Sequence, residues 1–335
     1  MRHTTADPPP VKRVSLSSAK ELCTTYLESS TKLSPETLLS YRHHLNNFLD
    51  WWANSQWSTF GLSATILKGY RAHLDRKALT LRSRGLRLAA VRSWCSFLKD
   101  EGYLATSLFD DIPSFKKPDS ISGGYLTEHE IHHFQRIFTK TDLFNYRDYV
   151  IARLMLKTGI RESELCRAQI SDISPVEKGG TLFLYSKGKG EKEEELFLTQ
   201  DLYHELRVYL RWRRRRGFSI APHEPLFIGH RETITPAGQR LSAHEVRRRL
   251  TLALRQAGLV RKSLTVLSLR HTAAISAFRN GASEGEVQKM MRHEDPRTTV
   301  IYQRLASRLE GRAEPYLTIT PSHDPAPTTP AASEA

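Results

Sequence analysis

Residues 269–302 read LRHTAAISAFRNGASEGEVQKMMRHEDPRTTVIY, and two segments inside them, 269–280 and 283–291, are predicted to be helices. Upstream, residues 181–185 (TLFLY) and 193–198 (EEELFL) are strand-like, and the glycine-bearing turn SKGKGEK joins them, which predicts a β-hairpin. Further helices are predicted over 145–157, 161–168, 201–216 and 242–257. The fold class predicted for this half is therefore mainly α with a small β-hairpin or sheet (α+β).

The first half of the chain is predicted to be almost wholly helical. Ser34 followed by Pro35 predicts a helix start, with serine as the N-cap and proline at the first helical position. Apolar residues at steps of three or four then mark one buried stripe, Leu38, Tyr41, Leu45, Phe48 and Trp52. Helices are predicted over 19–27, 35–57, 65–75 and 84–100. The last two of these helices and the turn between them gather a basic face, Arg71, Arg76, Lys77, Arg82, Arg84, Arg87 and Arg92. The candidates for binding nucleic acid are Arg71, Arg82, Arg84, Arg87 and Arg92 of this face, together with Lys187 and Lys192 of the glycine-bearing turn.

Composition divides the chain into two blocks with polar ends. Residues 1–15 and 318–335 are polar and proline-bearing, and both are predicted to be disordered. The predicted domains are a helical DNA-binding domain over 16–112, a linker over 113–124 and a second domain over 125–317. Thr127 and Glu130 have the spacing of a capping box and predict the first helix of the second domain.

Charge and cysteine content limit the partner and the compartment. Lys and Arg number 50 against 36 Asp and Glu, a formal charge of +14, which predicts a polyanionic partner, most simply nucleic acid. A ribosome-associated or membrane-surface protein would be equally basic. Cys23, Cys95 and Cys166 form no disulfide framework or CxxC pair. With no signal-peptide run at the start and no apolar stretch of membrane length, we expect a cytoplasmic, nucleoid-associated protein that makes no membrane contact.

Tyr302 is the candidate nucleophile. A tyrosine has a reference pKa of about 10, so only about one phenol in a thousand is ionised at pH 7, and it needs an electron-poor phosphorus to attack. Arg161 in TGIRESEL and Arg270 in LRHT are candidates for binding a phosphate, because a guanidinium stays charged and its fork can hold two oxygens. Each is expected at or near a helix N-terminus, where the dipole favours an anion.

Other polar residues complete the candidate site. A leaving 5′ oxygen needs a proton, which Lys189, flanked by Gly188 and Gly190, could deliver. Two other lysines compete for that role, Lys187 and Lys192. His293 is a candidate hydrogen-bond donor to the phosphate, and Glu164, three residues after Arg161, could orient the catalytic group. This set of groups could attack and stabilise a phosphodiester without a metal or any other cofactor.

The order and spacing of these motifs over residues 127–312 resemble the tyrosine recombinase (phage integrase) family. TGIRESEL resembles the box around the family's first catalytic arginine, GKGEK its β-hairpin lysine motif, and LRHT with RHEDPRTTVIY its second box. The resemblance implies catalytic roles for Arg161, Lys189, Arg270, His293 and Tyr302. It also implies a core-binding (SAM-like) first domain, a catalytic second domain, and cutting and rejoining of double-stranded DNA at specific sites by a tetramer. An accessory protein or a paralogous recombinase is a further expected partner.

Two positions depart from the family pattern. Leu267 stands where the family usually has a histidine, three residues before the second arginine, and leucine can neither donate nor accept a proton. The enzyme is therefore expected to be slower, to use another group such as Ser268, or to depend on a partner. Arg292 replaces the common glycine before His293, and it is expected to place another cation near DNA.

Several residues and two other functions remain as alternatives. His271 is expected to be a structural, buried hydrogen-bonding residue, and the run 213–216 either grips DNA or is a solvated helix end. The pairs His43-His44 and His132-His133 are expected to be solvated rather than metal ligands. A recombinase descendant that binds DNA without cutting it is the rival to a recombinase, motivated by Leu267. A type IB topoisomerase-like enzyme would share the chemistry without pairing two sites.

Overall fold

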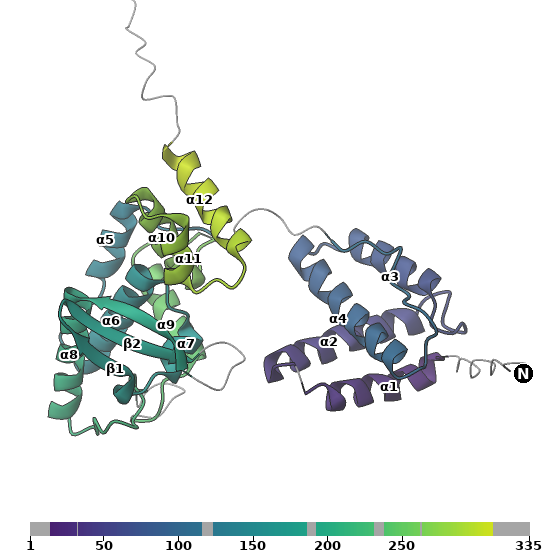
Figure 1. Cartoon of the computed structure of the whole chain (residues 1–335), viewed down its shortest axis with the longest axis horizontal. Coiled ribbons are helices and arrows are strands. Elements are labelled where there is room, and N and C mark those ends of the chain that lie inside the picture. Colours follow the sequence, from purple (N-terminus) through teal and green to yellow (C-terminus); the bar gives the residue numbers. More distant parts are fainter. Residues whose placement is uncertain are drawn as a thin grey trace, which may run out of the picture. The chain divides into compact units, whose positions relative to one another are not determined.

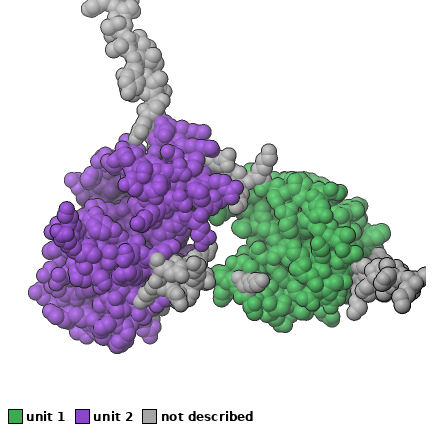
Figure 2. All heavy atoms as spheres, viewed as in Figure 1, with its two compact units in different colours: residues 1–119 green, residues 120–335 purple. Residues whose placement is uncertain are grey.

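The computed structural model describes residues 14–31, 33–115, 123–185, 192–230, 238–261 and 263–310. The chain forms two compact units, residues 1–119 and residues 120–335, drawn in green and purple in Figure 2. The predicted disordered ends lie outside the described residues except for positions 14 and 15, and so does most of the predicted linker. The exact domain limits given above stay predictions.

In its described residues, unit 1 contains four helices, α1 (Leu16–Ser29), α2 (Pro35–Ala53), α3 (Ala64–Arg76) and α4 (Leu81–Asp100), labelled in Figure 1. Ser34 caps α2 as predicted, since its side chain accepts from the Thr37 amide and Pro35 occupies the first turn. The core is rich in aromatic rings: Phe48 lies 4.9 Å from Tyr70 and 6.2 Å from Trp94, centroid to centroid. These rings come from α2, α3 and α4, and they meet in the edge-to-face and tilted arrangements that aromatic side chains prefer.

Helix α2 ends earlier than the sequence predicts. It stops at Ala53 rather than at Trp57, and the chain turns back after Asn54. The turn lets the buried Trp52 indole donate to the Trp57 carbonyl at 3.0 Å. A buried N–H that lacks an acceptor costs more than a short helix extension gains, which accounts for the early stop.

Unit 2 is built around α6 (Leu143–Thr158), which packs against α8 (Gln200–Arg215) and α10 (Leu267–Arg279). The remaining helices are α5 (Glu128–Arg136), α7 (Glu162–Arg167), α9 (Ala243–Gln256), α11 (Glu284–Met291) and α12 (Pro296–Glu310). Thr127 and Glu130 form the predicted capping box at the start of α5. The predicted helices 145–157, 161–168, 201–216, 242–257, 269–280 and 283–291 agree with the structure to within two residues at each end.

A small antiparallel sheet completes unit 2, in the order β1 (Ile173–Val176), β2 (Gly179–Tyr185) and β3 (Lys192–Thr199). Strands β2 and β3 form the predicted hairpin, with Leu182 opposite Leu196 and both side chains buried. Strand β1 was not predicted: it has only four residues, and one of them is Pro175. The predicted α+β class, mainly helical with a small sheet, is confirmed.

Helix α12 is the second element missing from the sequence-based prediction, and it carries Tyr302. It packs on α10 and α11, as Figure 1 shows at the yellow end of the chain. In the part of the chain that the structure describes, no helix is both long and apolar enough to cross a membrane.

Gly159, directly after α6, is predicted to be sensitive to substitution. Its φ is +61°, and a Cβ there would lie 2.6 Å from the Met291 sulfur. A left-handed conformation costs a non-glycine residue about 1–2 kcal/mol, and the overlap adds to it, so Gly159→Ala should lower the free energy of unfolding by more than that. Urea denaturation measures it, with Gly258→Ala as the control, because Gly258 has φ +69° and nothing within 4 Å. Equal losses for both variants would contradict a role for close packing at Gly159.

Candidate active site

Arg161 lies at the N-cap of α7, immediately after the tight turn that ends α6. Its backbone N–H donates to Glu164 Oε2 at 3.0 Å, and its guanidinium donates to Glu164 Oε1. Glu164 is buried. Burial by itself would raise the pKa of Glu164, but Arg292 and Arg161 outweigh that and lower it. The carboxylate is therefore ionised at neutral pH and fixes one edge of the Arg161 guanidinium, as expected from the spacing of three residues.

Arg270 lies in the first turn of α10 and is 3% exposed. Its guanidinium donates to the carbonyl oxygens of Gly159 and Met291. Burial, with help from the positive charges of Arg161 and Arg292, lowers the pKa of Arg270 to about 10. It still carries a charge at neutral pH, and two carbonyls from different segments hold its plane before any ligand arrives.

Tyr302 lies on the face of α12 that meets α10. It is 6% exposed, its hydroxyl is 2.8 Å from His271 Nδ1, and its ring stacks on that of His293 with centroids 5.8 Å apart. Burial raises the pKa of Tyr302, and the charges of Arg270 and Arg161 oppose the rise. The phenol is thus near both arginines while its oxygen is paired with His271.

His293 follows α11 and reaches the same cluster. Its Nδ1 lies 2.8 Å from Thr299 Oγ1. Burial, then Arg270 and Arg161, lower the pKa of His293 to about 4, so the ring is neutral at pH 7 and keeps one ring nitrogen as a donor. Burial and Arg270 likewise lower the pKa of His271 to about 4. His271 is buried and hydrogen-bonded, as the sequence analysis expected.

Sequence reasoning missed Thr299 and the direct partner of the tyrosine. Thr299 is fully buried and holds His293, while His271 contacts the Tyr302 hydroxyl. A helix starting at Pro296 would have placed Thr299 and Tyr302 three residues apart on one face. That start signal, a proline at the first helical position, is present in the sequence.

The two departures from the family pattern have different surroundings. Leu267 begins α10 and is 45% exposed, and its own side chain carries no proton donor or acceptor. Ser268 is buried, and its Oγ accepts from the Thr265 amide at 3.0 Å. Arg292 was expected to lie near DNA, but its side chain is 4% exposed and pairs with Glu164 at 2.7 Å. It is turned inward because two buried or half-buried carboxylates, Glu164 and Glu194, attract it.

The candidate lysines are on or beside the β2–β3 turn. Lys187 and Lys189 lie outside the described residues, and so does the side chain of Lys192, the first residue of β3. The described strands place the base of this turn at Tyr185 opposite Lys192. The role of Lys189 remains a prediction from the sequence.

Most of the arginines expected to bind DNA through unit 1 have partners within the unit. Arg71 donates to the Pro113 carbonyl and pairs with Asp75. Arg92 donates to Ser114 Oγ at 2.5 Å and to the Ile112 carbonyl at 2.8 Å. Arg84 binds two further backbone carbonyls. Arg82 is exposed, and Arg87 is partly exposed. The first three therefore help to hold residues 109–115 and the α3–α4 turn, and Arg82 and Arg87 are better placed for an external partner.

The four arginines at the end of α8, residues 213–216, also fall into a buried and an exposed group. Arg213 is buried and donates to the carbonyls of Pro225 and Leu226, at 2.6 and 3.3 Å. Its three successors, residues 214–216, are exposed. Arg213 is thus a structural residue. Within this run, only the exposed residues 214–216 are placed to contact DNA.

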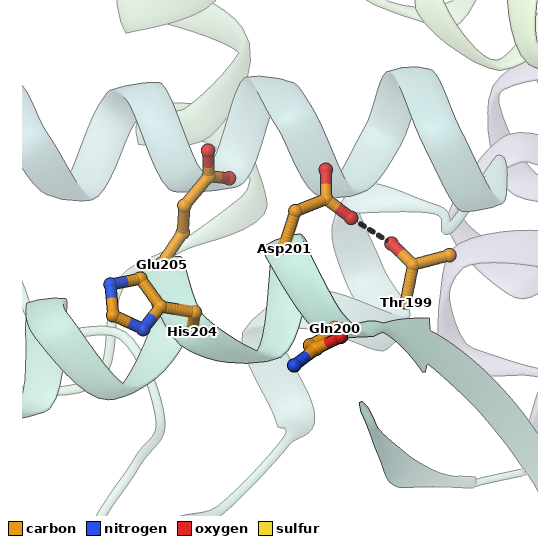
Figure 3. Close-up of a pocket in the computed structure, with 5 residues that line it drawn as sticks. All are labelled: Thr199, Gln200, Asp201, His204 and Glu205. Atoms are coloured by element: carbon orange, nitrogen blue, oxygen red, sulfur yellow. Dashed lines mark hydrogen bonds between the residues drawn. The ribbon is translucent and has the colours of Figure 1, made fainter. Parts of the chain in front are cut away.

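A surface hollow of about 640 Å³ lies at the start of α8 (Figure 3). Its lining residues are Thr199, Gln200, Asp201, His204 and Glu205. Asp201 pairs with Arg153 at 2.6 Å and with Lys157 at 2.7 Å, and Glu205 pairs with Arg153 at 3.1 Å. These carboxylates join α8 to α6. None of the lining residues belongs to the cluster of Arg161, Arg270, His293 and Tyr302. Within the described ranges, no group of three or more His, Cys, Asp or Glu residues could hold a metal ion.

Comparison with known proteins assigns both units to the family that the sequence motifs resemble. Residues 125–308 match the phage integrase family, and residues 22–102 match its N-terminal SAM-like domain. The chain is 30% identical to tyrosine recombinase XerA of Pyrococcus furiosus over 289 residues, covering 85% of this chain and 88% of XerA. It is 26% identical to tyrosine recombinase XerD of Lacticaseibacillus casei over 288 residues, covering 84% of this chain and 92% of XerD.

Solved structures support the fold. The XerH site-specific recombinase bound to palindromic difH substrate aligns with a TM-score of 0.68 at 18% identity, covering 90% of this chain and 84% of XerH. A lambda integrase dimer bound to a COC′ core site aligns with a TM-score of 0.64 at 15% identity, covering 89% and 82%. From the family match over more than half of its length, the XerA relative and the arrangement of Arg161, Arg270, His293 and Tyr302, we conclude that the chain belongs to the phage integrase family of tyrosine recombinases.

Proposed function

We propose that this protein is a site-specific DNA recombinase that cuts and rejoins duplex DNA through Tyr302. The observation that supports this most is the convergence of four groups from separate elements: Arg161 before α7, Arg270 in α10, His293 after α11 and Tyr302 in α12. A phenol can supply the nucleophile for a phosphodiester exchange, and two guanidiniums and a neutral imidazole can stabilise the charge that develops on the phosphate.

In the proposed reaction the Tyr302 oxygen attacks the scissile phosphorus and forms a 3′-phosphotyrosyl ester. The bond from phosphorus to the 5′ oxygen breaks, the phenol proton passes to solvent water, and Lys189 gives the leaving oxygen a proton, with Lys187 and Lys192 as the alternatives. A 5′ hydroxyl of a second duplex then attacks the ester and releases Tyr302. Each step replaces one phosphate ester by another, so the scheme balances without a metal ion or a nucleotide.

The fixed groups around Tyr302 would stabilise the pentacoordinate transition state. Arg270 is held by the carbonyls of Gly159 and Met291, and Arg161 by Glu164, so little reorganisation is needed when charge develops on the phosphate. With Thr299 at Nδ1, His293 has Nε2 left to donate to a phosphate oxygen. The Tyr302 hydroxyl lies 2.8 Å from His271 Nδ1, so this contact has to open or to pass on the phenol proton when the oxygen attacks.

The assembly that we propose contains double-stranded DNA and four copies of this chain on two sites. The two units would contact the duplex largely through phosphates, which makes binding strongly dependent on salt. The XerH and lambda integrase structures contain bound DNA, which supports a DNA partner for this chain as well. An accessory protein or a paralogous recombinase would explain how an active site with Leu267 reaches its full cleavage rate. We place the protein in the cytoplasm, associated with the nucleoid.

The experiment that tests this function is strand exchange between two duplexes. The site is first selected from a random-sequence pool by binding and is then built into two duplexes with different flanks. In EDTA and without nucleotide, the wild type should produce the two recombinant duplexes. Relaxation of supercoiled DNA without preference for the site, and without recombinants, would instead identify a topoisomerase-like enzyme.

A second candidate function is DNA binding without cleavage, as a recombinase-derived regulator. The exposed Leu267 favours it, because a hydrogen bond that the family usually makes at this position is absent here. The four other groups of the cluster, which are present together, favour the enzyme. Binding of the selected site with no exchange and no covalent adduct would support the regulator.

Leu267→His is predicted to raise the single-turnover cleavage rate by about 10²-fold, the loss seen when one transition-state donor is removed elsewhere. The rate is measured on a nicked duplex carrying the selected site. Leu252→His is the matched control, because Leu252 is also 45% exposed but lies on α9. An unchanged or lower rate for Leu267→His would mean that the site has been rebuilt around leucine.

A further inference from the structure

Arg292 has a backbone conformation that its side chain does not favour. It follows α11 with φ 51° and ψ 54°, and among the described residues only Lys140 is another non-glycine with positive φ. Glycine adopts this conformation without strain. A strained arginine persists where its side chain makes contacts that outweigh the backbone cost, so the contacts of Arg292 require an explanation.

The side chain of Arg292 is 4% exposed and lies between two carboxylates from different elements. Nη2 is 2.7 Å from Glu164 Oε2 in α7, and Nε is 3.4 Å from Glu194 Oε2 in β3. Nη1 donates to the Met290 carbonyl at 2.8 Å. These contacts use the guanidinium inside the protein, which leaves it poorly placed to bind a DNA phosphate directly.

The contact with Glu164 reaches the candidate catalytic arginine. Glu164 uses Oε1 for the Arg161 guanidinium, while Oε2 accepts from both the Arg161 backbone and Arg292. Arg292 therefore fixes the second oxygen of the carboxylate whose first oxygen orients Arg161. Without Arg292, a buried carboxylate would have a single cationic partner, and it could turn toward solvent and take Arg161 with it.

The contact with Glu194 reaches the strand that carries the lysine turn. Glu194 pairs with Leu184 across the hairpin, two residues beyond Lys192 at the base of the turn. One side chain thus ties the end of α11, the α7 N-terminus and β3 together. These are the elements that hold His293, Arg161 and the turn with Lys189.

We propose that Arg292 is a positioning residue for DNA cleavage, which acts by holding Glu164, and hence Arg161, in register with β3. This role rests on the proposed function. It predicts that removing the guanidinium slows the chemical step at saturating DNA and leaves DNA affinity nearly unchanged. If Arg292 contacted a phosphate, its removal would weaken DNA binding. If Arg292 were purely structural, its removal would lower only the folded fraction of the protein.

The test measures three quantities for each variant: the single-turnover rate on the nicked selected site, the DNA dissociation constant, and the melting temperature. Arg292→Met should slow cleavage by about 10²-fold, in the range for loss of a supporting contact to a catalytic group, with affinity within about threefold by our estimate. Arg292→Lys keeps the charge and should recover about tenfold of the loss. Arg297→Met is the control, because Arg297 is 90% exposed and, among the described residues, forms an ion pair with Asp295 alone, and it should cleave at the wild-type rate.

Two further variants keep the test decisive if Arg292→Met folds poorly. Arg292→Gly relieves the backbone, so it should melt at or above Arg292→Met and still cleave slowly. Glu194→Gln should slow cleavage when it is made in the wild type. It should slow cleavage little further when it is made in Arg292→Met, because both substitutions remove the same link. If the wild type cleaves and Arg292→Met cleaves at the same rate, or loses only DNA affinity, the role of Arg292 is overturned and the proposed function is not. Failure of the wild type to cleave would overturn the proposed function and this role together.

Discussion

Tyr302→Phe is expected to bind the selected DNA site as tightly as the wild type and to form no covalent adduct. The substitution removes one oxygen, the proposed nucleophile, and also its 2.8 Å contact with His271. Loss of one such buried contact costs about 1 kcal/mol, too little to unfold the unit. Adduct formation is read from a nicked duplex in denaturing gel electrophoresis, and binding is read from the same duplex without the nick.

Tyr149→Phe is the matched control for this prediction. Tyr149 is another largely buried tyrosine of unit 2 whose hydroxyl makes one hydrogen bond, to Glu205 at 2.9 Å. It should lose similar stability and keep adduct formation. An adduct with Tyr302→Phe would show that another residue is the nucleophile.

Arg270→Ala is expected to reduce cleavage by more than about 10³-fold and to destabilise unit 2. The catalytic loss follows from removing a fixed charge at the phosphate, where a single donor contributes about 10²–10³ in rate. The loss of stability follows from leaving the Gly159 and Met291 carbonyls unpaired, at about 1–3 kcal/mol for each unsatisfied group. Single-turnover cleavage and urea denaturation measure the two effects.

Arg213→Ala separates these effects, because Arg213 is also buried and also donates to two backbone carbonyls. It should be destabilised to a similar extent, yet its folded fraction should cleave at the wild-type rate. If both variants cleave at the same reduced rate, the effect of Arg270 is on folding and the proposed phosphate contact is wrong. Arg270→Lys keeps the charge without the fork, and it should remain well below the wild-type rate.

Local sequence signals predicted most of the fold. Ser34 with Pro35, and Thr127 with Glu130, specify helix starts through short-range hydrogen bonds, and both are present in the structure. The hairpin was predicted because two strand-like runs flank a glycine-bearing turn, and the structure buries Leu182 and Leu196 opposite each other. β1 was not predicted, because it is short, contains proline and depends on a partner strand that a local pattern does not include. α12 was not predicted, although Pro296 marks its start, because the residues before it are polar and charged.

The candidate site was predictable in its members but not in its contacts. The order of the motifs in the sequence identified Arg161, Arg270, His293 and Tyr302. The His271–Tyr302 contact joins α10 to α12 across 31 residues, and no spacing rule predicts it. The same holds for Arg292, for which the departure from the family pattern suggested a cation near DNA and the structure shows an inward ion pair. In both cases the tertiary packing of buried charges, rather than local propensity, decides where the side chain points.

Mapping the attachment point of trapped DNA tests the central claim most directly. The wild type is incubated with a nicked duplex carrying the selected site, and the adduct is digested with trypsin and nuclease. We expect the nucleotide on residues 298–304, TTVIYQR, attached to Tyr302 through a 3′-phosphate. Attachment to any other residue, a 5′ linkage, or no adduct on a site that the protein binds tightly would contradict the account.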